Sequence, residues 1–245
     1  MYSVLLCAAL ALALAFGGSL AGFYGWIWAT VIALVLFAVS WVLLARYLGQ
    51  RLQPAMARVQ KQMEAGMLDN AMETLDGMLP MGRWVPMLRG QILGHMGMLA
   101  YHSGKKERAV ELLEGASLRA PDARLMLACI HYKAGKTDKA LAILDLAGKV
   151  NKKHALLHNT HAWMLHKNGK SDEAQALLAA FLKRDAANAQ TKDNLLRLQN
   201  RTRMNMQAFD MQWWALGLEQ PPQAMGQMRR APKGFREPPK QPGRG

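Results

Sequence analysis

The chain divides into three stretches that differ in the pattern of their apolar and polar positions. From Met1 to Ala45 apolar residues are nearly continuous, and there is no Asp, Glu, Lys or Arg. From about Gln50 to Asn200 apolar residues recur at helical spacing, without the sustained alternation that is typical of strands. After Glu219 proline and basic residues dominate. The pattern predicts an all-α protein with an apolar N-terminus, a helical middle and a tail that cannot bury a core.

The apolar N-terminus has room for two membrane-spanning helices. About 20 helical residues cross the hydrocarbon core of a bilayer, and the two apolar runs are Val4–Leu20 and Trp26–Leu44. Two glycines between the runs permit a tight turn. Basic residues that follow the second run are normally retained in the cytoplasm. They are Arg46, Arg51, Arg58 and Lys61. We therefore expect a transmembrane helical hairpin over residues 1–48 in a bacterial inner membrane, with the remainder on the cytoplasmic side.

Other interpretations of the N-terminus remain open. A signal peptide cleaved near Ser19–Ala21 would leave one span and a periplasmic protein, although Met1–Ser3 lacks the positive charge that usually begins such a peptide. The first run is also near the lower length limit for a span, so a short or re-entrant segment would fit. Val4-Leu5-Leu6-Cys7 resembles a lipoprotein box only faintly, because neither basic residues nor a sufficient apolar run precede it.

The helical middle contains a short repeated phrase, Gly-Lys-x-acid-x-Ala. It begins at Gly104, Gly135 and Gly169, and a fainter copy begins at Gly66. The alanines of the four copies are 38, 31 and 34 residues apart. A period in the low to mid thirties is typical of stacked helix pairs. The sequence therefore predicts a solenoid of about four such pairs.

Each position of the phrase has a structural explanation. The glycine would end one helix in a left-handed conformation. The acid would lie at the start of the next helix, where it complements the helix dipole and can cap free N–H groups. The alanine would lie where two helices cross closely, and a leucine four residues later would face the same interior. These leucines are Leu113, Leu144 and Leu178.

These residues resemble the tetratricopeptide repeat, a helix–turn–helix unit of 34 residues with small side chains at fixed positions. Gly97, Ala128 and Ala162 match the small position of the first helix, and Pro121 matches the terminal proline. The resemblance covers roughly Leu52 to Asp185. The first unit is degenerate, residues 80–86 form an inserted loop, and no unit has the usual tryptophan near its start. Residues 189–200 are expected to form the capping helix that a solenoid requires.

The resemblance implies a right-handed superhelix whose first helices line a concave groove. Proteins of this family usually bind peptides, extended segments or other subunits, so it implies a protein partner, no cofactor and no enzymatic activity. Aromatic residues with nearby lysines would suit an extended peptide of apolar or acidic character. The groove positions carried over from the family are Met98, Tyr101, His102, Cys129, Tyr132, Lys133, Asn159, Trp163, His166 and Lys167.

The predicted organisation has four parts. Residues 1–48 form the transmembrane hairpin, and residues 49–203 form the α-solenoid with its capping helix. Residues 204–219 are rich in Met and Trp and are expected to pack onto the last repeat as a helix, although such side chains also suit a partner or a membrane interface. Residues 220–245 form a disordered, Pro-rich basic tail.

Three patterns resemble nucleotide- or metal-binding motifs, but each lacks residues that such a site requires. Gly135-Lys136-Thr137 and Gly169-Lys170-Ser171 resemble the end of a phosphate-binding loop, but the earlier glycine and a preceding strand are missing. His154, His158 and His161 share helical spacing, without the acidic or cysteine partners that would favour a metal site. No catalytic set of residues stands out. The two cysteines have no partner nearby in sequence and are expected to be buried thiols.

The formal net charge of +14 lies entirely after residue 45. A strongly basic balance favours acidic partners, and anionic lipid or nucleic acid would suit the basic tail. The sequence as a whole predicts a membrane-anchored scaffold or adaptor that mediates protein–protein interaction or complex assembly. The alternative is a membrane-associated nucleic-acid-binding protein that uses the tail.

Overall fold

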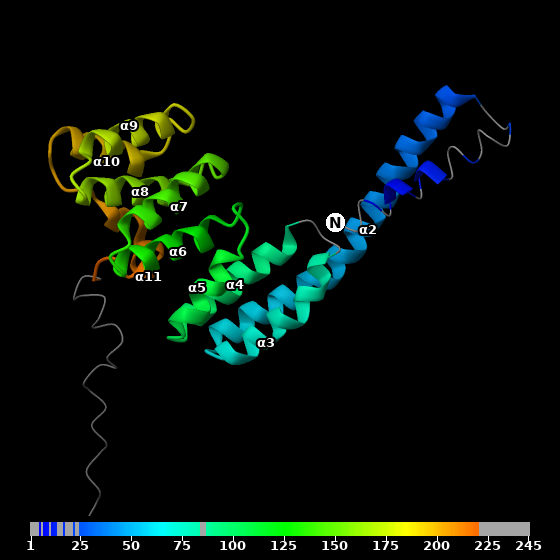
Figure 1. Ribbon diagram of the computed structural model, residues 1–245, viewed down its shortest axis with the longest axis horizontal. Helices are drawn as coiled ribbons and strands as arrows, with labels where there is room; N and C mark the ends of the chain where they lie inside the picture. Colours follow the sequence, from blue (N-terminus) through cyan, green and yellow to red (C-terminus); the bar gives the residue numbers. More distant parts are fainter. Residues whose placement is uncertain are drawn as a thin grey trace, which may run out of the picture.

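The protein is all-helical over the part of the chain that the computed structural model describes, which comprises residues 5, 7–9, 11–13, 17, 22, 25–83 and 87–220. Figure 1 shows the elements in chain order. They are α2 (Trp26–Glu64), α3 (Leu68–Met78), the 3₁₀ helix η1 (Leu79–Arg83), α4 (Leu88–His102), α5 (Lys106–Glu114), α6 (Pro121–Lys133), α7 (Thr137–Val150), α8 (Ala155–Lys167), α9 (Ser171–Leu182), α10 (Ala189–Gln199), the 3₁₀ helix η2 (Met206–Phe209) and α11 (Asp210–Leu216).

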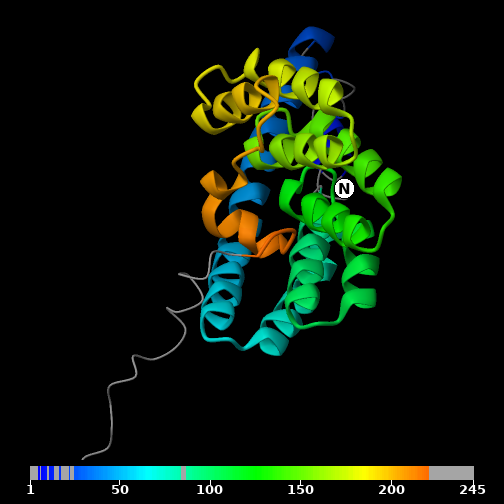
Figure 2. The ribbon, with the colours of Figure 1, turned by 90° about the vertical axis from the view of Figure 1, so that its left-hand side faces the viewer.

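The helices pack as successive pairs, as the repeat predicts. α2 packs with α3, α4 with α5, α6 with α7 and α8 with α9, and α10 covers α9 at the end of the series (Figures 1 and 2). The apolar core has two clusters. One surrounds Leu75 between α2, α3 and α4, and the larger one extends from Leu113 to Leu216. The expected α-solenoid of about four helix pairs is therefore confirmed as a fold.

The motif glycines end helices in the left-handed conformation that the sequence predicts. Gly66, Gly104, Gly135 and Gly169 have φ values of 73°, 79°, 75° and 79°. The residue after each glycine donates its N–H to a carbonyl five positions earlier, for example from Lys136 to His131 at 2.9 Å. This is the Schellman arrangement, which satisfies carbonyls that the helix end would otherwise leave free.

The motif alanines and leucines lie at the helix crossings. Ala71, Ala109, Ala140 and Ala174 are completely buried, and so are the three leucines that follow at four residues' distance. A Cβ atom added to Gly97 would lie 2.6 Å from Cγ of Leu113, so α4 and α5 approach too closely for any side chain there. Small residues therefore set the spacing of the pairs.

The expected capping role of the motif acids is wrong. The residues that precede α5, α7 and α9 are Lys105, Lys136 and Lys170, and none of the three helices has a side-chain cap. Glu107, Asp138 and Asp172 lie in the first turn instead. They are past the position that accepts from the free N–H groups, so they can act only through the helix dipole.

α2 is one continuous helix of 39 residues. Its C-terminal half contributes Val59 to the core of the first pair, so the expected boundary between residues 48 and 49 falls inside the helix. Over the described residues, no helix combines the length and apolar character needed to span a membrane. The transmembrane hairpin expected over residues 1–48 is therefore unsupported, and most of its first run lies outside the described residues.

Two other predictions also fall on residues that the structure does not describe. The inserted loop begins with η1, but residues 84–86 are outside the described part. The basic tail lies outside it as well, except for Gln220. Its expected disorder and its binding to lipid or nucleic acid stay predictions.

Candidate functional site

The inner helices α6 and α8 are contacted by the end of the same chain. We call Met204–Glu219 the C-terminal segment, and the surface formed by α4, α6 and α8 the groove. The segment places five apolar side chains in the larger core cluster. They are Met204, Met206, Phe209, Trp213 and Leu216. The segment was expected to pack onto the last repeat, but its Leu216 carbonyl also contacts Lys133 in the third unit. Lys133 in turn bonds Tyr101 of the second unit.

Aromatic rings make the centre of this contact. Trp213 is completely buried, and its ring centroid lies 5.3 Å from that of Trp163 on α8, at an interplanar angle of 71°. Tyr132 on α6 meets Trp163 from another side, with centroids 5.8 Å apart. The ammonium of Lys167 lies 5.6 Å from the Trp163 centroid. Edge-to-face rings and a cation over an indole are favourable beyond the area that they bury.

Lys133 ties the segment to two units. Its Nζ atom donates to the carbonyl oxygen of Leu216 at 2.6 Å and to the hydroxyl of Tyr101 at 2.8 Å. The same ammonium lies 5.4 Å from the centre of the Tyr101 ring. The Leu216 carbonyl, at the end of α11, has no hydrogen-bond partner within its own helix. The Lys133 ammonium donates a hydrogen bond to this oxygen, and its positive charge complements the negative end of the helix dipole.

Asn159 belongs to a buried network of polar side chains. Its Nδ2 donates to the Thr191 hydroxyl at 2.7 Å, and its Oδ1 accepts from Nδ2 of Asn194 at 2.9 Å. Oδ1 of Asn194 in turn accepts from the backbone N–H of Asn205 at 2.6 Å. All three side chains are completely buried. The network joins α8, α10 and the start of the C-terminal segment, so Asn159 faces α10 instead of an open groove.

The remaining sequence-predicted positions divide between the groove and its surroundings. Met98 is half-buried and lines a small cavity between α4 and α6 that also contains His95 and Asp122. His102 is exposed beside Tyr101, with ring centroids 6.0 Å apart. His166 bonds the Ser171 hydroxyl at 2.9 Å, at the start of α9. The structure thus brings together Tyr101, Tyr132, Lys133, Trp163 and Lys167 and leaves Met98, His102 and His166 aside.

Cys129 lies under the groove and is completely buried. Burial raises the pKa of its thiol to about 12, with a small opposing effect of Lys133. The expectation that Cys7 and Cys129 are buried thiols is confirmed.

The three histidines of the possible metal set have separate roles. His154 caps α8, accepting from the N–H of Leu157 at 3.2 Å, and pairs with Asp122. His158 and His161 are buried beside α9. No group of three or more His, Cys, Asp or Glu side chains suited to a metal occurs within the described ranges.

Sequence reasoning expected the C-terminal segment to pack onto the last repeat, but it missed the contact of the segment with Lys133 and its buried partner Asn194. The density of Met and Trp in residues 204–218 was the available signal, since such side chains are usually buried or bound. Composition alone does not indicate which surface receives them.

Comparison with known proteins supports a tetratricopeptide repeat in the third unit. The sequence model of the tetratricopeptide repeat family matches residues 122–149, which cover nearly all of α6 and α7. No curated protein matches the chain.

Several solved structures are similar in arrangement. A crystal structure of MamA protein has 15% sequence identity to this chain and a TM-score of 0.44. The match covers 69% of this chain and 91% of the MamA chain. A Podosopora anserina putative kinesin light chain with nearly identical TPR-like repeats has 16% sequence identity to this chain and a TM-score of 0.44. The match covers 74% of this chain and 98% of the kinesin light chain structure. At this level the likenesses carry no argument about function.

Proposed function

We propose that the protein is a membrane-anchored scaffold whose groove binds an extended segment of a partner protein, without catalysis. The observation that supports this proposal is the way in which the C-terminal segment lies on the groove. Trp213 packs on Trp163, and Lys133 bonds the Leu216 carbonyl at 2.6 Å. An aromatic anchor in a dry pocket, with a charged group on a backbone carbonyl, is typical of sites that hold peptides.

One feature of the groove favours exchange of its occupant. The indole N–H of Trp163 is buried and has no hydrogen-bond partner among the described residues. A buried donor without an acceptor costs about 1–3 kcal/mol. A partner segment that brings an acceptor to this N–H would recover that free energy. We therefore expect the preferred partner to combine an aromatic or methionine anchor with a polar acceptor for this N–H.

A synthetic peptide with the sequence of residues 204–219 tests the proposal in trans. In the full-length Trp213→Ala variant the internal segment has lost its anchor, so a fluorescent peptide should bind saturably to the groove. The unchanged protein should bind the same peptide at least about tenfold more weakly, because its own segment competes at high effective concentration. Fluorescence anisotropy measures both affinities.

Two matched controls define the site. Adding Trp163→Ala to the Trp213→Ala variant removes the groove partner and should abolish binding. A peptide with alanine in place of the Trp213 indole should also fail to bind. Equal binding of the peptide to the protein with and without Trp163 would contradict the groove assignment.

The membrane anchor is part of the same proposal, although it rests on the sequence and on exposed side chains. No charged residue occurs in the first 45 positions, and basic residues follow at Arg46 and Arg51. Large apolar side chains of α2 are exposed to solvent, among them Ile27, Leu34 and Leu43. Lipid contact would remove this surface from water. The proposed location is the cytoplasmic face of a bacterial inner membrane.

Protease treatment of membrane vesicles tests the anchor and its orientation. A C-terminal tag should remain with the membrane after alkaline washing. It should be digested in inside-out vesicles and protected in right-side-out vesicles. Release of the full-length protein by the wash, or protection of the tag in inside-out vesicles, would contradict this part of the proposal.

A further inference from the structure

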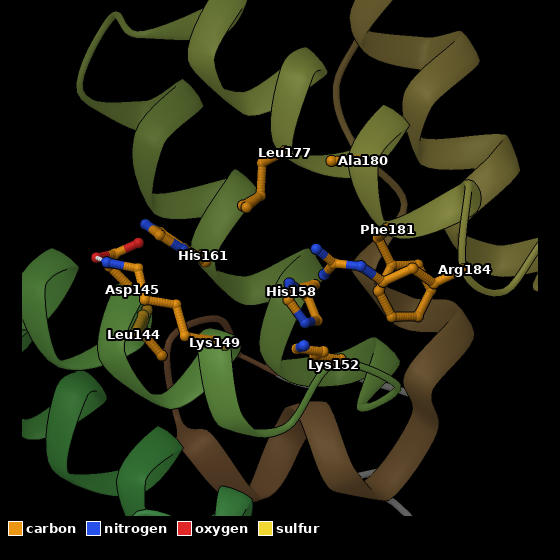
Figure 3. A pocket seen from close by; sticks show the side chains of 11 residues that line it. Leu144, Asp145, Lys149, Lys152, His158, His161, Leu177, Ala180, Phe181 and Arg184 are labelled. Atoms are coloured by element: carbon orange, nitrogen blue, oxygen red, sulfur yellow. Dashed lines mark hydrogen bonds and ion pairs between the residues drawn. The ribbon is translucent and has the colours of Figure 1, made fainter.

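A second cavity lies away from the groove, between α7, α8 and α9. It has a volume of about 370 Å³ and opens to solvent. Figure 3 shows its lining, in which apolar Leu177 and Phe181 stand beside several nitrogen-bearing side chains. Nothing in the repeat motif requires a cavity here.

The charges around the cavity are unbalanced. The lining cations are Lys149, Lys152 and Arg184, and the acid of the lining is Asp145. The Asp145 carboxylate is already paired with the Lys149 ammonium at 2.7 Å. No ion pair to Lys152 or Arg184 occurs within the described part of the chain. The cavity therefore presents two cations that an anion would neutralise.

His158 provides a buried acceptor in the same cavity. Its Nε2 lies 3.3 Å from the carbonyl oxygen of Asn151, so Nε2 carries the proton and the neutral ring leaves a lone pair on Nδ1. Nδ1 is buried and has no hydrogen-bond partner among the residues described, and His158 as a whole residue is 4% exposed. In the view of Figure 3 the ring lies between the ends of Arg184 and Lys152.

The surroundings keep the His158 ring neutral and in place. Burial lowers its pKa, and the positive charge of Arg184 lowers it further, against the bond to Asn151. The Phe181 ring lies 4.9 Å away, and a Cβ atom on Gly148 would come within 3.1 Å of the imidazole. His161, the other histidine of the lining, has its pKa lowered to about 4 by burial, so it adds no charge near neutral pH.

We propose that this cavity binds a phosphoryl group, held by Arg184 and Lys152 and recognised through the free Nδ1 of His158. Arginine and lysine favour phosphate oxygens, and phosphate near neutral pH keeps a proton that it can donate to an acceptor. Sulfate has the same shape but no such proton. The cations also lie just beyond the C-terminal ends of α7 and α9, where the helix dipole favours positive charge. The dipole explains the position of the cations, but it does not explain the unpaired Nδ1 of His158.

Calorimetric titration of the full-length protein with inorganic phosphate tests the proposal. We expect saturable binding of phosphate and at least about tenfold weaker binding of sulfate. Arg184→Gln should weaken phosphate binding about tenfold, because a charge-assisted bond is lost. Lys183→Gln makes the same charge change on an exposed neighbour outside the cavity and should leave the affinity unchanged.

His158→Phe provides the test of recognition. It keeps a ring against Phe181 but removes the acceptor, so the preference for phosphate over sulfate should disappear. Absence of saturable phosphate binding would overturn the proposal. So would equal affinity for sulfate in the unchanged protein, or equal loss of binding in Lys183→Gln and Arg184→Gln.

Discussion

Replacing Trp213 by alanine is expected to lower the free energy of unfolding by about 3–5 kcal/mol, the cost of truncating a large buried aromatic side chain. Trp213 is completely buried and contacts Trp163 through an edge-to-face arrangement at 5.3 Å. Its Nε1 donates to Glu219 at 3.2 Å, and that carboxylate also pairs with Arg203. The substitution thus removes both the anchor and the bond that closes the segment on itself. Denaturant titration measures the loss.

The neighbouring tryptophan gives a matched control. Trp214 is half-buried at the edge of the same core, so Trp214→Ala should cost clearly less than Trp213→Ala. Similar losses for the two variants would show that the segment is held by general apolar contact. Such a result would contradict the specific role of the Trp163–Trp213 contact.

Lowering the pH is expected to destabilise the protein through His161. Burial lowers the pKa of His161 from 6.5 to about 4, with Asp145 opposing the effect. The unfolded state therefore binds a proton that the folded state excludes, and stability falls as the pH drops from about 6.5 to about 4. A difference of this size corresponds to a loss on the order of 3 kcal/mol at the low end.

Comparison with His161→Gln isolates this contribution. Burial lowers the pKa of His158 and His131 too, so the unchanged protein loses stability from several sites in the same direction. Asp122 adds a loss at lower pH, because its bond to His154 lowers the pKa of its carboxyl. The variant should lose clearly less stability between pH 7 and pH 4.5. An equal loss in both proteins would exclude His161 as the main titrating group.

The sequence predicted the repeat well because its determinants are local. A glycine in the left-handed conformation, a buried alanine five residues later and a leucine one turn further each act over a few residues. Gly135, Ala140 and Leu144 show all three. The capping role of the acids failed for an equally local reason, since Asp138 lies two positions after the N-cap residue Lys136 of α7.

The groove was less predictable because its content depends on distant contacts. The family resemblance indicated Tyr132, Lys133 and Trp163, and the structure does place them together. However, Trp163 and Trp213 are separated by 50 positions, and no periodicity links them. Asn159 matched a groove position, but its partner Asn194 belongs to a helix outside the repeat pattern. Such pairings follow from how the chain returns on itself, which a repeat motif does not specify.

A double-mutant cycle between Trp163 and Trp213 tests the central claim most directly. The free energy of unfolding is measured for the unchanged protein, for Trp163→Ala, for Trp213→Ala and for the double variant. If the C-terminal segment lies on the groove, the two losses should be non-additive by about 1 kcal/mol or more. If the two losses of unfolding free energy add within about 0.5 kcal/mol, the two rings do not meet. This result would contradict the claim that the C-terminal segment occupies the groove.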